Sequence, residues 1–328
     1  MAGRATDTSK SHSLADTHMD PLNLMALDIV DEAIDFADEL ALEVYELENG
    51  ATVIDFGVET TGGVDAGLLL VELQTGGLAS VQTNVESLAG APLTHVGLTT
   101  DHPALCLLCS QKAGWELETD QFGGLGSGPA RALVAEEAEF ARTGFGEDAD
   151  FAVLTVETDT LPVAAVADQV AQRAGVTSAS TFLGVFAAAS PAGSLSLSAR
   201  AAGMGVYRLS ELGYDPLDIL SVSSVAPIAP VAPTEEQAIA RTNDALAYGG
   251  RVHMTVGEPF DRFDDVASTA AEDHGVPFEE IFEATDWDVT EIDRGVFAPA
   301  QVTIDVLGGE THVFGAVEEA IVADSFGL

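Results

Sequence analysis

Positive charge is what this sequence has least of. Its 328 residues include 12 lysines and arginines against 54 aspartates and glutamates, so the formal net charge at pH 7 is −42. Only Lys10 and Lys112 are lysines. An electrostatic field of this sign repels nucleic acid and anionic membrane surfaces, which excludes both as partners. It also makes each arginine or lysine that is present a candidate for a specific task.

Cysteine and long apolar runs are scarce as well. The two cysteines, Cys106 and Cys109, cannot supply a disulfide framework. No run of 18 apolar residues is present, so the sequence predicts no membrane-spanning helix. Residues 1–20 are polar and lack the apolar centre of a secretory signal, and we expect them to form a disordered extension. These absences predict a cytoplasmic protein.

Apolar residues, in contrast, are plentiful. They make up 47% of the chain, which is enough for a large core and argues against a disordered acidic chain. The length corresponds to two domains or one large one. A dense acidic surface is tolerable at molar salt, where the Debye length falls to about 3 Å. We therefore expect a globular protein from the cytosol of a salt-loving organism.

Helix and strand patterns mix along the chain without a regular β–α–β period, which predicts an α+β fold with mixed sheets. Asn49-Gly50 between two apolar runs predicts a β-hairpin, and Thr234 with Gln237 predicts a capped helix. Other helices are expected at 101–113, 129–144 and 162–174, and strands at 66–73, 79–83, 151–157, 181–186 and 251–256. The expected domains are a first α+β domain at 21–190 and a second α+β domain at 191–328, after the extension 1–20.

One short motif could bind a metal ion. His102, Cys106 and Cys109 would share one face of a helix, where they and a water could hold zinc in a hydrolase. The alternative is that both cysteines are small core residues. The alternative is favoured because no second Cys-x-x-Cys pair is present, so no metal is predicted.

Two glycine-rich stretches are candidate ligand loops. Residues 123–131 (GGLGSGPAR) open a helix, where free N–H groups and Arg131 could bind an anion; a tight turn with a capping serine is the alternative. They match neither nucleotide-binding fingerprint. Residues 57–63 (GVETTGG) end a strand and contain one acid, Glu59, in the kind of loop that commonly carries function. For Glu59 the alternative is a solvated surface glutamate.

The stretch SLSLSARAAGMG, residues 194–205, sets one arginine apart. Serines alternate with apolar residues up to Arg200, which predicts a half-buried strand over 194–200. No acid follows Arg200 within five residues. Because a lone buried arginine is costly, Arg200 needs an anionic partner, a wet pocket or backbone carbonyls as acceptors.

Eight segments, in order and at consistent spacing, resemble the archaeal methenyltetrahydromethanopterin cyclohydrolases. They are ELENGATVIDFGVETTGG (46–63), TTDHPA (99–104), QKAGW (111–115), GSGPARAL (126–133), APIAPVA (226–232), RTNDALAYGG (241–250), GVFAPA (295–300) and DSFGL (324–328). The resemblance runs from about residue 22 to the C-terminus. It implies a two-domain α+β subunit with an interdomain pocket, commonly assembled as a homotrimer.

The resemblance also implies a reaction. Members of that family add water to the methenyl carbon between N5 and N10 of a reduced pterin and open the C–N10 bond, which gives the 5-formyl compound. This implies a hydrolase of one-carbon metabolism that uses no metal or organic cofactor. The reduced pterin could be of the methanopterin or the tetrahydrofolate type.

Site residues follow from the resemblance, with one departure. Arg200 matches the family's catalytic arginine, but Gly203 stands where the family has the glutamate that would accept a proton from water. Glu59 is the first candidate for a replacement carboxylate. A non-catalytic pterin-binding protein is the alternative interpretation of that loss. The expected substrate-binding residues are Lys112, Gly126, Ser127, Gly128, Arg131 and Ser198.

Overall fold

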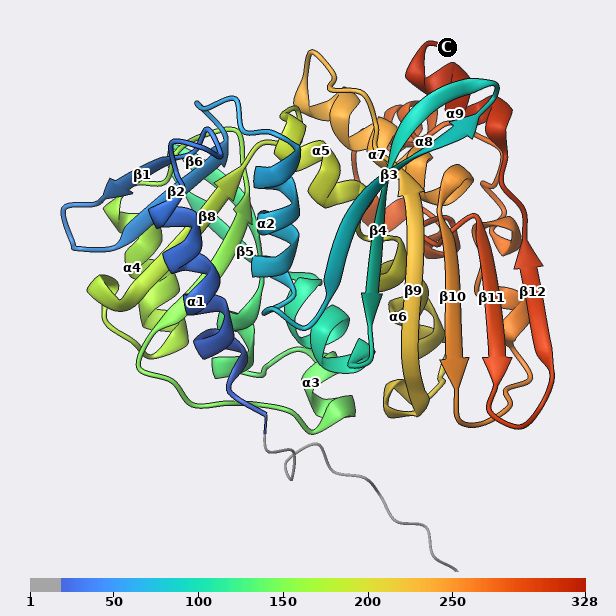
Figure 1. Ribbon diagram of the computed structural model, residues 1–328, viewed down its shortest axis with the longest axis horizontal. Coiled ribbons are helices and arrows are strands. Elements are labelled where there is room, and N and C mark those ends of the chain that lie inside the picture. The colour runs from blue at the N-terminus through green and yellow to red at the C-terminus, as the bar shows by residue number, and fades with distance from the viewer. Residues whose placement is uncertain (1–18) are drawn as a thin grey trace, which may run out of the picture.

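Two six-stranded sheets with helices around and between them make up the protein (Figure 1). The structure is a computed structural model that describes residues 19–328. The predicted extension 1–20 therefore lies almost entirely outside the described residues. Both sheets are mixed, and they confirm the predicted α+β class. In the described part of the chain, every helix is too short or too polar to cross a membrane.

The first sheet has a parallel centre and antiparallel edges. In spatial order it contains β1 (Glu43–Glu46), β2 (Thr52–Gly57), β8 (Thr181–Phe186), β7 (Ala152–Glu157), β6 (Phe122–Ser127) and β5 (Ala113–Thr119). The strands β2, β8 and β7 run parallel. The predicted Asn49-Gly50 hairpin joins β1 to β2, with Gly50 at a φ of +83°. Helices α1 (Leu22–Asp35) and α2 (Val64–Gln74) lie over one face, and α4 (Ala164–Ala174) lies over the other (Figure 1).

The second sheet has helices on one face only. In spatial order it contains β12 (Thr311–Gly315), β11 (Gln301–Val306), β10 (Arg251–Val256), β9 (Ile219–Pro227), β4 (Ala91–Thr100) and β3 (Ser80–Leu88). Only β10 and β11 run parallel. Helices α6 (Ala201–Leu212) and α7 (Glu235–Gly249) lie behind it in Figure 1, and its other face is open toward the viewer.

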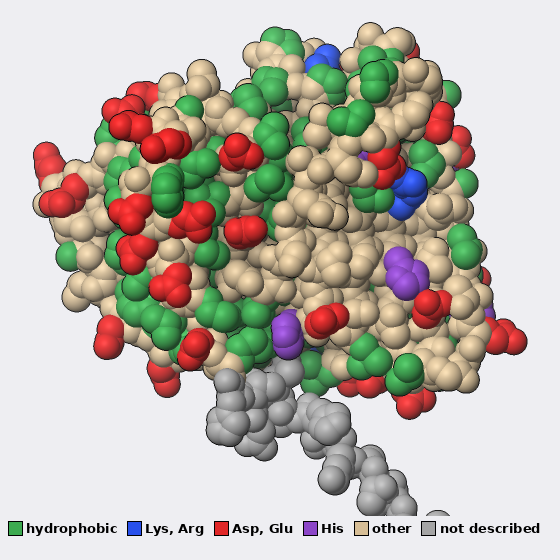
Figure 2. All heavy atoms as spheres, viewed as in Figure 1, with side chains coloured by type: hydrophobic (Ala, Val, Ile, Leu, Met, Phe, Trp, Pro, Cys, Tyr) green, Lys and Arg blue, Asp and Glu red, His purple; other side chains and the backbone are tan. Residues whose placement is uncertain are grey.

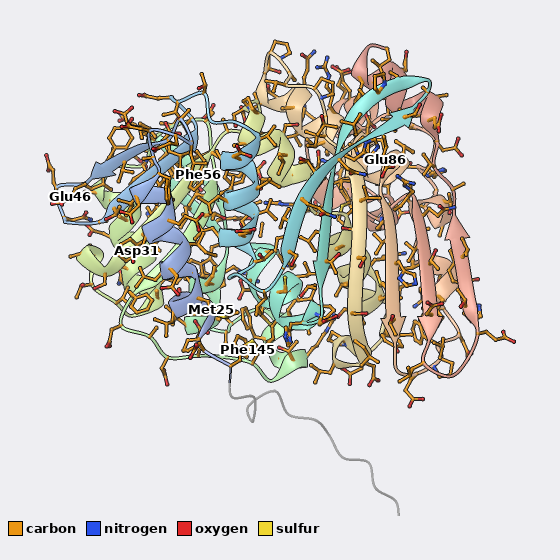
Figure 3. All side chains as sticks on the ribbon, in the orientation of Figure 1. Met25, Asp31, Glu46, Phe56, Glu86 and Phe145 are labelled. Atoms are coloured by element: carbon orange, nitrogen blue, oxygen red, sulfur yellow. The ribbon has the colours of Figure 1, made fainter. Side chains whose placement is uncertain are left out.

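A layer of helices joins the two sheets. Helix α5 (Pro191–Ser198) packs against both α2 and α7, and the π-helix η2 (Ala104–Gln111) packs against α6. Phe56, labelled in Figure 3, belongs to the core between β2 and these helices. Further helices are α8 (Phe278–Ala284) and α9 (Glu319–Phe326). Short turns of 3₁₀-helix include η4 (Ser178–Ser180), η5 (Pro216–Asp218), η6 (Phe263–Asp265), η7 (Ser268–Ala270), η8 (Val289–Glu291) and η9 (Arg294–Val296).

The predicted strand over 194–200 is wrong, because these residues belong to helix α5 and its C-terminal end. Ser190 accepts a hydrogen bond from the N–H of Gly193, and Pro191 occupies the first helical position. The helix therefore begins at Pro191, before the first residue of the predicted strand. The serine stripe does not face solvent. Ser194 donates to the carbonyl of Ala229, and Ser196 donates to the side chain of Gln74. Buried partners on two sides allow a helix that alternates serine and leucine.

The predicted strand over 66–73 is wrong for a different reason. This apolar run forms helix α2, which lies between the first sheet and helix α5, so nearly all of its sides are buried. Leu69 and Leu73 pack in the core of the first sheet, while Val71 packs in the core of the second. A helix that is apolar all round lacks the one-sided pattern that would identify it.

The predicted helix over 129–144 is interrupted. It consists of η3 (Pro129–Leu133), a turn of 3₁₀-helix, and α3 (Ala138–Thr143), separated by Ala135 at a φ of +53°. A helix cannot continue through that backbone conformation. The break turns the chain so that Glu137 reaches Arg131, six residues earlier.

The strands before and after residue 190 do not fall into separate sheets. Strands β3 and β4 precede that position in the chain, yet β4 pairs with β9 in the second sheet. The domain boundary near 190 stays a prediction, and the β3–β4 hairpin crosses it.

Candidate functional site

A pocket lies where strand ends of the first sheet meet the helices that cover the second. It encloses about 320 Å³, a size suited to part of a small organic ligand. Most of its wall is apolar, with three charged side chains set into it. It is lined by Leu107, Gln111, Lys112, Ala113, Leu125, Glu157, Leu197, Arg200, Gly203, Met204, Tyr207, Ile239, Thr242, Asn243, Leu246 and Phe297.

Arg200 occupies the joint between helices α5 and α6. Helix α5 ends at Ser198, and Arg200 is the residue before the first turn of α6. Its side chain is 21% exposed, and its Nη2 lies 3.8 Å from Oε2 of Glu157. That distance is too long for a hydrogen bond. Within residues 19–328, the buried Nε and Nη2 atoms of Arg200 have no hydrogen-bond partner. Arg200 therefore has two donor nitrogen atoms that no protein acceptor satisfies.

Glu157 is the last residue of strand β7, at the end of the parallel centre of the first sheet. Its side chain is 17% exposed. Burial raises the pKa of this carboxyl group, Arg200 opposes that shift, and the negative charge of Glu235 adds to it. Glu157 is therefore a carboxylate that takes up a proton more readily than an ordinary surface glutamate.

Gly203 lies three residues after Arg200 on helix α6 and also lines the pocket. A Cβ atom placed on Gly203 would meet only Oε1 of Gln111, at 3.2 Å. The position where the resemblance places a glutamate is thus part of the same wall as Arg200, as the three-residue spacing on a helix requires. A side chain there requires the Gln111 amide to shift by a few tenths of an ångström.

Lys112 follows the π-helix η2 and contributes the third charge of the pocket. Its Nζ lies 3.4 Å from Oε1 of Glu139 and 5.2 Å from the centre of the Tyr207 ring. The neighbouring Gln111 is buried, and its Nε2 has no hydrogen-bond partner in the described part of the chain. Gln111 and Lys112 thus present polar groups to the pocket from one short segment.

Arg131 supports that segment from behind and does not line the pocket. It is fully buried, it donates to the carbonyl groups of Leu108, Ser110 and Lys112, and its Nε lies 2.9 Å from Oε1 of Glu137. These contacts account for most of the hydrogen-bonding capacity of a guanidinium group. Their effect is to hold the backbone of residues 108–112 in place.

The other predicted substrate-binding residues also lie behind the pocket wall. Gly126 packs on Trp115, the Ser127 hydroxyl group lies 2.8 Å from that of Thr155, and the N–H of Gly128 donates to the carbonyl of Ser110. Ser198 is fully buried and accepts a hydrogen bond from the N–H of Ala229. Their part in substrate binding stays a prediction, and the contacts of the structure are those of supports.

Glu59 is exposed, on the loop after β2, and does not line the pocket. Asp55 shapes this loop, because its carboxylate accepts hydrogen bonds from the N–H groups of residues 57–60. Gly62 packs against the first turn of α5, whereas Arg200 follows the last turn. Eight helical residues span about 12 Å. The structure therefore does not bring Glu59 and Arg200 together.

Both cysteines of the candidate zinc motif, Cys106 and Cys109, lie on η2 and are fully buried. Burial raises the pKa of Cys106 to about 12 and that of Cys109 to about 11, so both thiols stay protonated at neutral pH. Among residues 19–328, no group of three histidine, cysteine or acidic side chains is placed to hold a metal ion. The described side chains thus offer no ligand set for the zinc interpretation.

Sequence reasoning missed Glu157, Gln111 and Tyr207. A signal for Glu157 was present: the predicted strand 151–157 ends on it, and ligands commonly bind beyond the carboxyl ends of parallel strands. The parallel pairing of β7 with β8, however, is not readable from local pattern. The contacts of Gln111 and Tyr207 depend on how η2 packs against α6, which again no local pattern reveals.

The sequence of this chain is similar to a known protein family over nearly its whole length. The family model described as "Cyclohydrolase (MCH)" matches residues 21–326. A methenyltetrahydromethanopterin cyclohydrolase of Halobacterium salinarum is 56% identical over 310 residues, which cover 94% of this chain and 100% of the relative. The enzyme of that name from Methanothermobacter marburgensis is 39% identical over 94% of this chain and 99% of its own length. The chain belongs to the cyclohydrolase (MCH) family.

Proposed function

We propose that this protein hydrolyses a 5,10-methenyl tetrahydropterin, specifically methenyltetrahydromethanopterin, to the 5-formyl compound. The observation that carries the proposal is the Arg200–Glu157 pair at the wall of an apolar pocket, in a chain of this family. Relatives of both haloarchaeal and methanogen origin bear the name of that enzyme. The alternative, a pterin-binding protein without activity, has no support from these relatives.

The pocket suits the chemistry of such a substrate. Tyr207, Phe297 and Met204 offer apolar surface to a flat pterin ring. The methenyl group is a delocalised cation, and a carboxylate beside it favours its binding electrostatically. The free N–H donors of Arg200 orient the attacking water by hydrogen bonds. Lys112, at the pocket edge, attracts an anionic group on the tail of the substrate.

The activity test is loss of near-ultraviolet absorbance of the methenyl substrate in molar KCl. Methenyltetrahydromethanopterin and methenyltetrahydrofolate are compared with wild-type protein, with Arg200→Met, and with Arg173→Met as the matched control on the surface. We expect catalysed loss with the methanopterin substrate and a roughly 10²–10³-fold lower rate in Arg200→Met. Faster turnover of the folate would reassign the substrate. Acceleration of neither by folded protein would leave binding without catalysis.

Assembly as a homotrimer in the cytoplasm is part of the proposal. The resemblance of the sequence to the cyclohydrolases, which implies a homotrimer, supports it. Light scattering after size exclusion in molar KCl should give about three times the chain mass of 33.9 kDa. A monomeric wild type would contradict the proposal. Two free cysteines fit a reducing compartment.

A further inference from the structure

We propose that Glu157 is the general base of this enzyme, taking the role that a glutamate at position 203 would have; this rests on the proposed cyclohydrolase activity. The carboxylate beside Arg200 thus comes from another element of the fold. Glu157 reaches the pocket from the end of β7, while Arg200 and Gly203 reach it from α6 and the joint before it. Glu157 and Arg200 are far apart in the sequence, so no local motif reveals the pair.

Other carboxylates near the pocket are already engaged. Glu139 is buried, pairs with Lys112, and does not line the pocket. Glu235 accepts hydrogen bonds from the N–H groups of Ala188 and Ala189. Among the residues that the structure describes, Glu157 is the acid that faces the cavity.

The charges around Glu157 suit a proton acceptor. Arg200 faces it from the α5–α6 joint at 3.8 Å, and Glu235 lies nearby at the start of α7. Burial and Glu235 raise its pKa while Arg200 lowers it. General-base catalysis is most efficient when the pKa of the base lies near the working pH. The unpaired Nη2 of Arg200 lies 3.8 Å from this carboxylate and can hold a water against it.

The proposed step balances without a further reactant. A water oxygen bonds to the methenyl carbon, one water proton moves to Glu157, and the C=N π electrons return to nitrogen, which neutralises the cation. Protonated Glu157 then delivers its proton to N10 as the C–N10 bond breaks. The remaining hydroxyl proton leaves to solvent as the formyl C=O forms. The sum is one cation and one water giving the formyl compound and one proton.

The decisive experiment removes the carboxylate at position 157 and then restores one at position 203. Four proteins are compared in molar KCl: wild type, Glu157→Gln, the double variant Glu157→Gln with Gly203→Glu, and the exposed control Glu116→Gln on β5. We expect Glu157→Gln to lower kcat by about 10²–10⁴-fold, the usual contribution of general-base catalysis. The double variant should recover at least tenfold, because position 203 lines the same cavity as Arg200. The control should match wild type.

The pH profile separates proton transfer from a structural role. In wild type, kcat/KM should fall at acidic pH as a carboxylate protonates, and this limb should disappear in Glu157→Gln. Unchanged kcat in Glu157→Gln, a change confined to KM, or a 10²-fold loss in Glu59→Gln instead would overturn the proposal. So would a double variant with neither recovery nor its own acidic limb. Inactive wild type would refute the proposed function itself, which is a separate outcome.

Discussion

The two sheets have equal numbers of strands, but helices cover both faces of the first and one face of the second. The carboxylate that we propose as the base, Glu157, belongs to the first sheet. Strand β7 of the first sheet reads AVLTVE and is buried at its first five positions. Strand β10 of the second sheet reads RVHMTV and alternates between buried and less buried positions. A parallel centre covered on both faces reads as a continuous apolar run, whereas a half-covered sheet alternates. Figure 1 and Figure 2 show the open face of the second sheet.

This difference shows where each kind of charge can act. An ion pair on the open face stays hydrated, so it contributes little to stability or chemistry. The carboxylate of Glu157 is removed from water at the covered sheet, so its pKa responds strongly to its neighbours. The comparison between covered and open positions makes four predictions, in order of decreasing effect.

The largest effect is expected from the same substitution of one arginine beside each sheet. Arg131→Met leaves Glu137 and three carbonyl groups without a buried partner, so the free energy of unfolding should fall by about 3–5 kcal/mol. Arg251→Met breaks a half-exposed ion pair with Glu86 on the second sheet and should cost less than about 1 kcal/mol. Denaturant unfolding in molar KCl measures both. Equal losses would show that the open face is covered in solution.

Leucine truncation should repeat the contrast at a smaller scale. Leu154 on β7 is fully buried, so Leu154→Ala should lower the free energy of unfolding by about 2–5 kcal/mol. Leu220 on β9 is 41% exposed, and Leu220→Ala should cost less than about 1 kcal/mol. The midpoints of denaturant unfolding compare them directly. A cost for Leu220→Ala as large as that for Leu154→Ala would contradict the exposed position of Leu220.

A buried carboxyl group behind the second sheet should show in the pH dependence of stability. Burial raises the pKa of Asp244 to about 6, against about 3.9 in an unfolded chain. The native state therefore holds more protons between pH 4 and 6, and the free energy of unfolding falls as pH rises through that window. Asp244→Asn lacks this term, so its stability relative to wild type should rise by about 2 kcal/mol from pH 4 to 6. A difference in the free energy of unfolding between Asp244→Asn and wild type that does not change with pH would contradict the raised pKa of Asp244.

The smallest effect is expected from the matched change on the open face. Hydrogen bonds from Thr311 and His253 lower the pKa of Asp305. Its contribution is therefore present above the unfolded pKa and lost as the pH falls below it. Because Asp305 is exposed, Asp305→Asn should leave the unfolding midpoint at pH 7 close to that of wild type. A loss as large as that of a buried residue would mean that another surface covers this face.

Much of the fold was predictable where local chemistry decides it. The Asn49-Gly50 hairpin, the Thr234 cap and the strands ending at Glu157 and Val256 all appear as expected. Helices α2 and α5 were not predictable, because each is buried on several sides by segments far away in the chain. The serines of α5 find partners in Gln74 and Ala229, which pattern alone cannot supply.

By itself, the sequence determined the acidic surface, the α+β class and the family, and it singled out Arg200 as a candidate, because composition and motifs are local properties. Only the tertiary structure decided which acid faces Arg200. Glu157 reaches it through the parallel pairing of β7 and the joint between α5 and α6, while Glu59 is held by Asp55 at the other end of α5. Proximity across a fold depends on packing of distant segments, and ion pairing depends on that proximity.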